Sequence, residues 1–208
     1  MNALSPSPAQ GLDALLAGNR RFVTGAPRHP NQDAARRAEL APGQAPFAVL
    51  LGCSDSRLAA EIIFDQGLGD LFVVRTAGHV LGEEVLGSIE YATNVLDCRL
   101  VVVLGHDACG AIAAARTALE EGLPPAGYVR DVVERVTPSI LAARAAGLHG
   151  DQDLVDEHIR YTVELMLDRS RPLAAQVAAR HVAVVGLSYR LSEGTARIVT
   201  ARGLPATA

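Results

Sequence analysis

The segment Leu100-Val-Val-Val-Leu-Gly-His-Asp-Ala-Cys-Gly110 joins five aliphatic residues to a short polar end. A continuous aliphatic run of this length is typical of a strand that is buried on both faces of a parallel sheet. The alanine-rich residues that follow, up to about residue 121, favour a helix. The segment therefore predicts one strand–helix unit of a parallel sheet. Its polar residues lie at the edge where such sheets bind ligands.

Other aliphatic runs have the same character, namely Phe47–Leu51, which is followed by Gly52, then Leu71–Val74 and His181–Gly186. Apolar residues recur at near-helical spacing over about 12–24, and we expect a helix there. Further helices are expected over about 32–40, 85–96, 128–147 and 153–170. Residues 189–199 predict a terminal hairpin with Gly194 in its turn. Together these elements predict an α/β fold. It has a mostly parallel central sheet of four to five strands flanked by helices, with an N-terminal helical arm.

The chain contains no internal repeat and no linker-like segment, so we expect a single domain over residues 1–208. Residues 1–40 would form the N-terminal helical arm, and residues 181–200 the last strand and hairpin. Apolar residues make up 49% of the chain and charged residues 20%, which is enough apolar material for one substantial core.

Composition argues against several classes of partner. The formal net charge is −4 at pH 7, whereas nucleic acids and anionic membranes attract basic surfaces. The longest aliphatic runs have about five residues, and a membrane-spanning helix needs about 20. The first residues do not have the pattern of a secretory signal. We therefore expect no nucleic-acid partner, no membrane association and a cytoplasmic location, where thiols stay reduced.

Thiol, imidazole and carboxylate groups follow two of the predicted strands. Cys53 and Asp55 come after the run at 47–51, and His106 and Cys109 come after the run at 100–104. The spacing within each pair allows both side chains to face one point. Neighbouring strands lie about 4.8 Å apart, so the two pairs can share one ion. Two thiolates, an imidazole and a carboxylate suit tetrahedral Zn²⁺.

Alternatives remain open at this site. A lone cysteine is usually a small hydrophobic core residue, and Cys98, just before the run at 100–104, is assigned to the core for this reason. Arg57 offers Asp55 a second partner. With Asp55 on zinc the site would be closed, like a structural site. With Asp55 on Arg57 the fourth position would be open, as a catalytic zinc requires.

The motif Cys53-Ser-Asp-Ser-Arg57, together with His106-x-x-Cys109-Gly110, closely resembles the zinc motifs of the β-class carbonic anhydrases. The resemblance extends from about residue 43 to about residue 186 and is nearest to the actinobacterial branch of the family. The other residues that fit are Phe64, Gly67–Phe72, Val74, Arg75, Ala77, Gly78 and Ile89–Tyr91.

The resemblance implies one zinc ion per subunit, held by Cys53, His106 and Cys109. It also implies reversible hydration of carbon dioxide to bicarbonate and a proton, by hydroxide formed on the zinc. Asp55 and Arg57 would be the catalytic dyad that gates the fourth zinc position.

The same resemblance implies the substrate site. Gln44, in the stretch Gly43-Gln44-Ala45-Pro46, matches the substrate-binding glutamine of plant-type members. Phe72 and Tyr91 match the aromatic residues that line their cleft, and the N–H of Gly110 would assist in binding. Leu50 stands where the other branch has a tryptophan associated with a non-catalytic bicarbonate pocket, so a plant-type site is expected.

One residue departs from the family pattern, which usually has asparagine at position 79. For His79 a packing role is favoured over proton transfer. The family forms dimers that often pair into tetramers, so we expect a homodimer or a dimer-of-dimers tetramer. The apolar stripe of the N-terminal helix would then either wrap a neighbour or pack on its own domain.

Competing functions are a non-catalytic zinc- or bicarbonate-binding module and a hydrolase of carbon disulfide or carbonyl sulfide on the same scaffold. Arg57 argues against the first and Gln44 against the second. A thiol redox pair of Cys53 and Cys109 would lack the usual Cys-x-x-Cys spacing. The stretch Gly67-Leu-Gly69 precedes a strand and lacks the third glycine, so it does not indicate a dinucleotide-binding fold.

Overall fold

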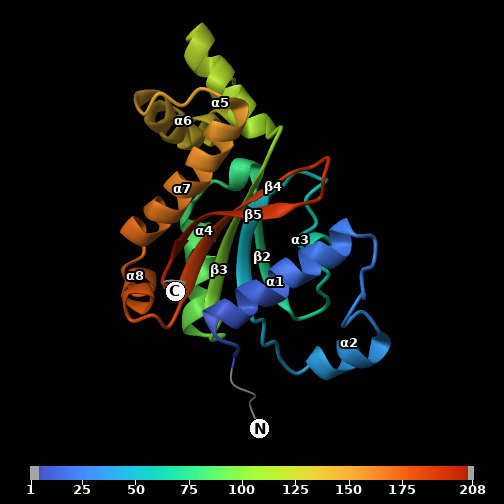
Figure 1. Cartoon of the computed structure of the whole chain (residues 1–208). Coiled ribbons are helices and arrows are strands. Elements are labelled where there is room, and N and C mark those ends of the chain that lie inside the picture. Colours follow the sequence, from blue (N-terminus) through green and yellow to red (C-terminus); the bar gives the residue numbers. More distant parts are fainter. Residues whose placement is uncertain (1–4, 206–208) are drawn as a thin grey trace.

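The computed structural model describes residues 5–205 and has a five-stranded sheet at its centre (Figure 1). The strands lie in the order β2-β1-β3-β4-β5. The first four are parallel, and β5 runs antiparallel beside β4. The predicted α/β fold with a mostly parallel sheet is confirmed. The strand bounds are β1 Ala48–Cys53, β2 Leu71–Thr76, β3 Leu100–His106, β4 Ala183–Tyr189 and β5 Ala196–Arg202.

Helices cover both faces of this sheet (Figure 1). On one face, Gly11 of α1 lies against Leu100 of β3. On the other face, Ile159 of α7 packs against Gly105 of β3 and Gly186 of β4. The helices are α1 Pro8–Val23, α2 Ala34–Leu40, α3 Ala60–Ile63, α4 Glu83–Asn94, α5 Gly110–Glu121, α6 Val129–Ala145, α7 Asp151–Arg169 and α8 Arg171–Ala178, and η1 Ala77–His79 is a short 3₁₀ turn. None of the helices in the described part of the chain is long and apolar enough to span a membrane.

Helix ends account for most differences from the expected elements. Helix α1 begins at Pro8 rather than near residue 12, because Ser7 and Gln10 form a reciprocal capping box and proline suits the first helical position. The short helices α3 and α8 were not expected. Helix α8 begins directly after α7, where Ser170 accepts a hydrogen bond from Leu173 N–H. The hairpin is present, although Tyr189 ends β4 rather than beginning a separate strand.

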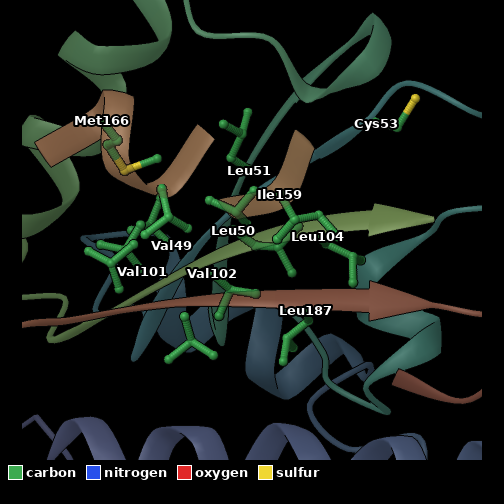
Figure 2. Packing of buried hydrophobic residues seen from close by; sticks show 14 of the residues in the cluster. Val49, Leu50, Leu51, Cys53, Val101, Val102, Leu104, Ile159, Met166 and Leu187 are labelled. Carbon is green, nitrogen blue, oxygen red and sulfur yellow. The ribbon is translucent and has the colours of Figure 1, made fainter. Parts of the chain in front are cut away.

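The core lies around the three central strands. All residues of β1, β3 and β4 are buried, whereas those of the edge strand β2 are mostly half-buried. Figure 2 shows the aliphatic side chains of these strands packed together, with Met166 and Ile159 of α7 among them. The side chain of Cys53 lies apart from the other labelled residues, at the end of its strand (Figure 2). The core therefore ends where the polar residues begin.

Helix α1 packs on its own chain. Leu12 and Leu15 are buried beneath it. Near its end, Asn19 donates hydrogen bonds to the carbonyl oxygens of Ile63 and Gly194. Arg21 Nε lies 2.5 Å from the buried carboxylate of Asp65. The apolar stripe of α1 thus packs against its own chain. Of the two arrangements expected for this helix, the structure has the one in which it packs on its own domain.

Candidate metal centre

Three candidate ligands meet at the carboxyl edge of the sheet. Cys53 is the last residue of β1, His106 is the last residue of the neighbouring β3, and Cys109 directly precedes α5. Because β1 and β3 are paired in parallel, their ends lie side by side. One donor atom from each residue lies within 4.8 Å of the donor atoms of the other two, and all three residues are buried. The structure therefore brings together the two sequence motifs that surround these residues.

The imidazole of His106 is oriented for metal binding. Its Nδ1 lies 2.7 Å from the backbone carbonyl oxygen of Asp107, which can only accept a hydrogen bond. Nδ1 therefore has the proton, and Nε2 has a free lone pair. This Nε2 is buried and has no hydrogen-bond partner within residues 5–205. A buried lone pair with no partner, beside two thiols, fits a metal ion.

The two thiols differ in their electrostatic surroundings. A hydrogen bond from Cys109 is the main cause that lowers the pKa of Cys53, and the backbone N–H of Gly78 acts in the same direction. That N–H lies 3.3 Å from Cys53 Sγ. Sharing of its proton with Cys53, together with burial, raises the pKa of Cys109. The first negative charge of the pair therefore forms on Cys53. Thiolate sulfur and neutral imidazole are a donor set that Zn²⁺ prefers, so the residues present fit the ion that the sequence predicts.

Asp55 is engaged by Arg57 rather than by the three-residue cluster. Its Oδ1 accepts hydrogen bonds from the backbone N–H and Nε of Arg57 at 3.0 and 2.9 Å, and its Oδ2 accepts one from Nη2 at 2.7 Å. These contacts with Arg57 hold the pKa of the Asp55 carboxyl well below its usual range. The carboxylate is therefore ionised across the neutral range. Of the two arrangements left open by the sequence, this structure has Asp55 paired with Arg57.

Arg75, at the end of β2, holds the loop that contains Asp55. Its Nε donates to the carbonyl oxygen of Cys53 at 3.0 Å and its Nη2 to that of Asp55 at 2.6 Å. Arg75 matches the family pattern in the sequence, but no role was predicted for it. The sequence does place an arginine near the carboxyl end of the strand beside β1. Which groups its side chain reaches, however, depends on the register of β1 and β2.

The predicted substrate residues lie away from the cluster within one chain. Phe72 of β2 pairs with Val49 of β1, whereas Cys53 pairs with Thr76. The two pairs are four positions apart, so Phe72 and Cys53 are separated by about 13 Å along the strands. Tyr91, on α4, lies beside Phe72 with the ring centroids 6.2 Å apart. Gln44 is exposed and precedes β1. Phe72 and Tyr91 therefore lie together toward the amino edge of the sheet, and Gln44 precedes β1 at that same edge, opposite the candidate ligands.

The remaining residues singled out in the sequence have clear positions. Gly110 is the first residue of α5 and is exposed directly after Cys109. His79 is fully buried, and burial lowers its pKa well below the usual value, so the ring is neutral. Its ring lies 4.4 Å from that of His158, which agrees with a packing role. Cys98 is buried outside the cluster, where its thiol donates to the Pro46 carbonyl oxygen.

Comparison with known proteins agrees with the geometry. A family model described as carbonic anhydrase matches residues 48–196. Carbonic anhydrase 2 of Mycobacterium tuberculosis is 54% identical over 190 residues, covering 91% of this chain and 92% of the relative. The carbonic anhydrase of Mycolicibacterium smegmatis is 55% identical over 188 residues, covering 90% and 91%.

A solved structure shows the same fold. The Coccomyxa β-carbonic anhydrase in complex with acetazolamide matches with a TM-score of 0.70 at 25% identity, covering 90% of this chain and 85% of that one. The family model and the mycobacterial relatives span most of the chain, including both motifs of the cluster. The resemblance noted in the sequence is thereby confirmed: the chain belongs to the β class of the carbonic anhydrase family, whose members hydrate carbon dioxide.

Proposed function

We propose that this chain hydrates carbon dioxide with one zinc ion per subunit, held by Cys53, His106 and Cys109, and with Asp55 and Arg57 as a dyad beside it. The buried cluster of two sulfur atoms and one unpartnered imidazole nitrogen supports this ligand set. Zinc held by these three residues would supply two things: a lower pKa for a water molecule near neutral pH, and electrostatic stabilisation of the negative charge that develops on oxygen.

The observation that carries the proposal is the pairing of Asp55 with Arg57. Both carboxylate oxygens of Asp55 accept hydrogen bonds from Arg57, so three protein ligands remain for the metal. A zinc site with three protein ligands keeps one position for the reacting molecule, which is the feature that separates catalytic from structural sites.

The low pKa of Asp55 determines what it does in the reaction. A carboxylate held ionised by Arg57 is a poor base, so it accepts a hydrogen bond from the attacking water and orients it without removing its proton. The N–H of Gly110, at the start of α5, would donate to the substrate oxygen that gains charge.

A direct test compares zinc-loaded, chelator-stripped and zinc-restored protein in stopped-flow assays of carbon dioxide hydration. We expect activity to disappear on stripping and to return with about one zinc per subunit. A stripped protein that hydrates carbon dioxide at the loaded rate would contradict the zinc role.

We further propose that a second copy of the chain supplies the substrate-binding residues, in a homodimer or a dimer of dimers. Gln44, Phe72 and Tyr91 lie at the opposite edge of the sheet from the candidate ligands of their own chain, so they cannot line the same cleft within it. Tyr91 is 46% exposed although it is large and aromatic, and β2 is an edge strand. A surface of this kind suits contact with another subunit.

Mixing two inactive variants tests this arrangement. Cys53→Ser removes a proposed ligand, and Gln44→Ala removes a proposed substrate contact. If Gln44 acts across the interface, a mixed dimer has one complete site, formed by the zinc of one subunit and Gln44 of the other. Half of randomly re-formed dimers are mixed, so we expect about a quarter of wild-type activity after joint refolding. Activity no higher than the average of the two variants would place Gln44 in the site of its own chain.

We also propose that residues 1–208 form a single domain and that the protein is cytoplasmic. Cys53, Cys98 and Cys109 are all free thiols, which suits a reducing compartment.

A further inference from the structure

A line of buried polar contacts runs from helices α6 and α7 to the sulfur of Cys53. Ser139 Oγ lies 2.9 Å from His158 Nδ1. His158 Nε2 lies 2.9 Å from the carbonyl oxygen of Gly78. The N–H of the same Gly78 donates to Cys53 Sγ at 3.3 Å. His158 and Ser139 are 1% and 0% exposed, so water does not replace these contacts.

The direction of each hydrogen bond follows from the chemistry of the groups. A carbonyl oxygen only accepts, so His158 Nε2 has the proton and donates to Gly78. Burial lowers the pKa of His158 to about 4, so the ring is neutral at pH 7 and Nδ1 accepts. The hydroxyl of Ser139 is the donor within reach of Nδ1, although it also lies 2.7 Å from the carbonyl oxygen of Val136. The single proton of that hydroxyl is shared between Nδ1 and the Val136 carbonyl oxygen, so the ring is held firmly through Nε2 and more weakly through Nδ1.

The backbone conformation of Gly78 is unusual, and a contact from another helix can help to hold it. Its φ of 65° lies in the left-handed region, and a Cβ there would lie 2.7 Å from Ala111 Cβ. The turn η1 that contains it is three residues long and has no side-chain cap. Within the turn, Thr76 Oγ1 donates to the carbonyl oxygen of Val80 at 3.0 Å, and the hydrogen bond from His158 adds a contact on Gly78 from outside the turn.

We propose that His158, oriented by Ser139, is a positioning residue of the metal centre, which fixes Gly78 so that its N–H stays directed at the sulfur of Cys53. The inference rests on the zinc site proposed above. A hydrogen bond to a thiolate withdraws charge from sulfur, so the sulfur donates less to the metal and the metal is a stronger Lewis acid. Loss of outer partners of this kind typically changes metal affinity or activity about 10–100-fold.

The alternative is a purely structural role for His158. Its ring packs against the ring of His79, and loss of the side chain would disturb that contact whatever happens at Gly78. The experiment therefore needs a readout of the sulfur itself. Thiolate-to-metal charge-transfer absorption of the cobalt(II)-substituted protein supplies one, because the band moves to lower energy when the sulfur is richer in electrons.

Four variants separate the two roles. His158→Phe keeps a flat ring of similar size but removes both nitrogens. His158→Gln keeps an N–H that can reach Gly78. Ser139→Ala removes only the hydroxyl that orients the ring. Val163→Ala, one turn further along α7, removes buried methyl groups without changing a polar contact and is the packing control.

We expect the charge-transfer band to move to lower energy in His158→Phe and by a smaller amount in Ser139→Ala, and to stay near wild type in His158→Gln and Val163→Ala. Hydration by the zinc form of His158→Phe should fall about 10–100-fold.

An unmoved band in His158→Phe, or an equal shift in Val163→Ala, would overturn the inference. If His158→Phe does not fold, the shift of the charge-transfer band in Ser139→Ala, compared with Val163→Ala, distinguishes the two roles. If the wild-type protein binds neither cobalt nor zinc, the zinc site itself fails, and with it this inference.

Discussion

Replacing Arg57 with alanine is expected to reduce carbon dioxide hydration about 100-fold, the upper end of the usual effect of losing an outer partner, while the protein keeps its zinc. Arg57 supplies the three hydrogen bonds that occupy both oxygens of Asp55. Alanine keeps the backbone N–H but removes both side-chain donors, so the carboxylate, two residues from Cys53, loses its counter-charge. It is then free to take the fourth zinc position, which closes the site to the reacting molecule. Stopped-flow hydration and metal analysis of the same sample measure both quantities.

A matched control for this variant is Arg130→Ala. Arg130 also pairs with a carboxylate at the surface, that of Glu134, but lies on α6 and away from the cluster. We expect it to retain wild-type hydration. If Arg57→Ala hydrates carbon dioxide near the wild-type rate, the dyad does not gate the metal. If it loses its zinc, Arg57 supports binding of the ion rather than access to it.

The second large effect is expected for Cys53→Ser, in which zinc and activity should be lost together. A serine hydroxyl stays protonated near neutral pH and is a far poorer zinc ligand than a thiolate. Loss of a direct ligand should cost more than loss of an outer partner, so we expect zinc affinity to fall by more than about 100-fold. Competition with a chromophoric chelator measures the affinity, and circular dichroism shows whether the fold is retained.

The same substitution at Cys98 is the control. Cys98 is buried like Cys53, and burial raises the pKa of its thiol to about 12, so it stays protonated. Its thiol donates to the carbonyl oxygen of Pro46, and a serine hydroxyl can donate there as well. Cys98→Ser should therefore keep zinc and activity. Full zinc content in Cys53→Ser would remove Cys53 from the ligand set, and zinc loss in both variants would indicate a general effect of the substitution on folding.

Local sequence patterns were sufficient to predict the parallel sheet and the cluster of candidate ligands. The run Leu100–Leu104 is apolar at every position, and only a strand covered on both faces buries all of it. Because carboxyl ends of paired parallel strands meet at one edge, residues that directly follow two such runs had to lie close together. Cys53, His106 and Cys109 were identified in this way.

Helix ends were less predictable because they depend on single capping contacts. The capping box of Ser7 and Gln10 extended α1 beyond its apolar stripe. Helix α8 is short and begins at a serine directly after α7, so periodicity gave no separate signal for it.

What the sequence determined by itself is thus the parallel sheet, the family and the convergence of three candidate ligands, since each depends on patterns within short segments and on one general rule of strand direction. The tertiary structure decided the partner of Asp55, the distance between Gln44, Phe72 and Tyr91 and the cluster, and the contact of His158 with Gly78, 80 positions away in the chain. These depend on rotamer choice, strand register and helix packing. The positions of the substrate residues and the contact of His158 are set by contacts between distant segments, which no local pattern of residues encodes. The Asp55–Arg57 pair is local, and the sequence left open only which of two partners Asp55 takes.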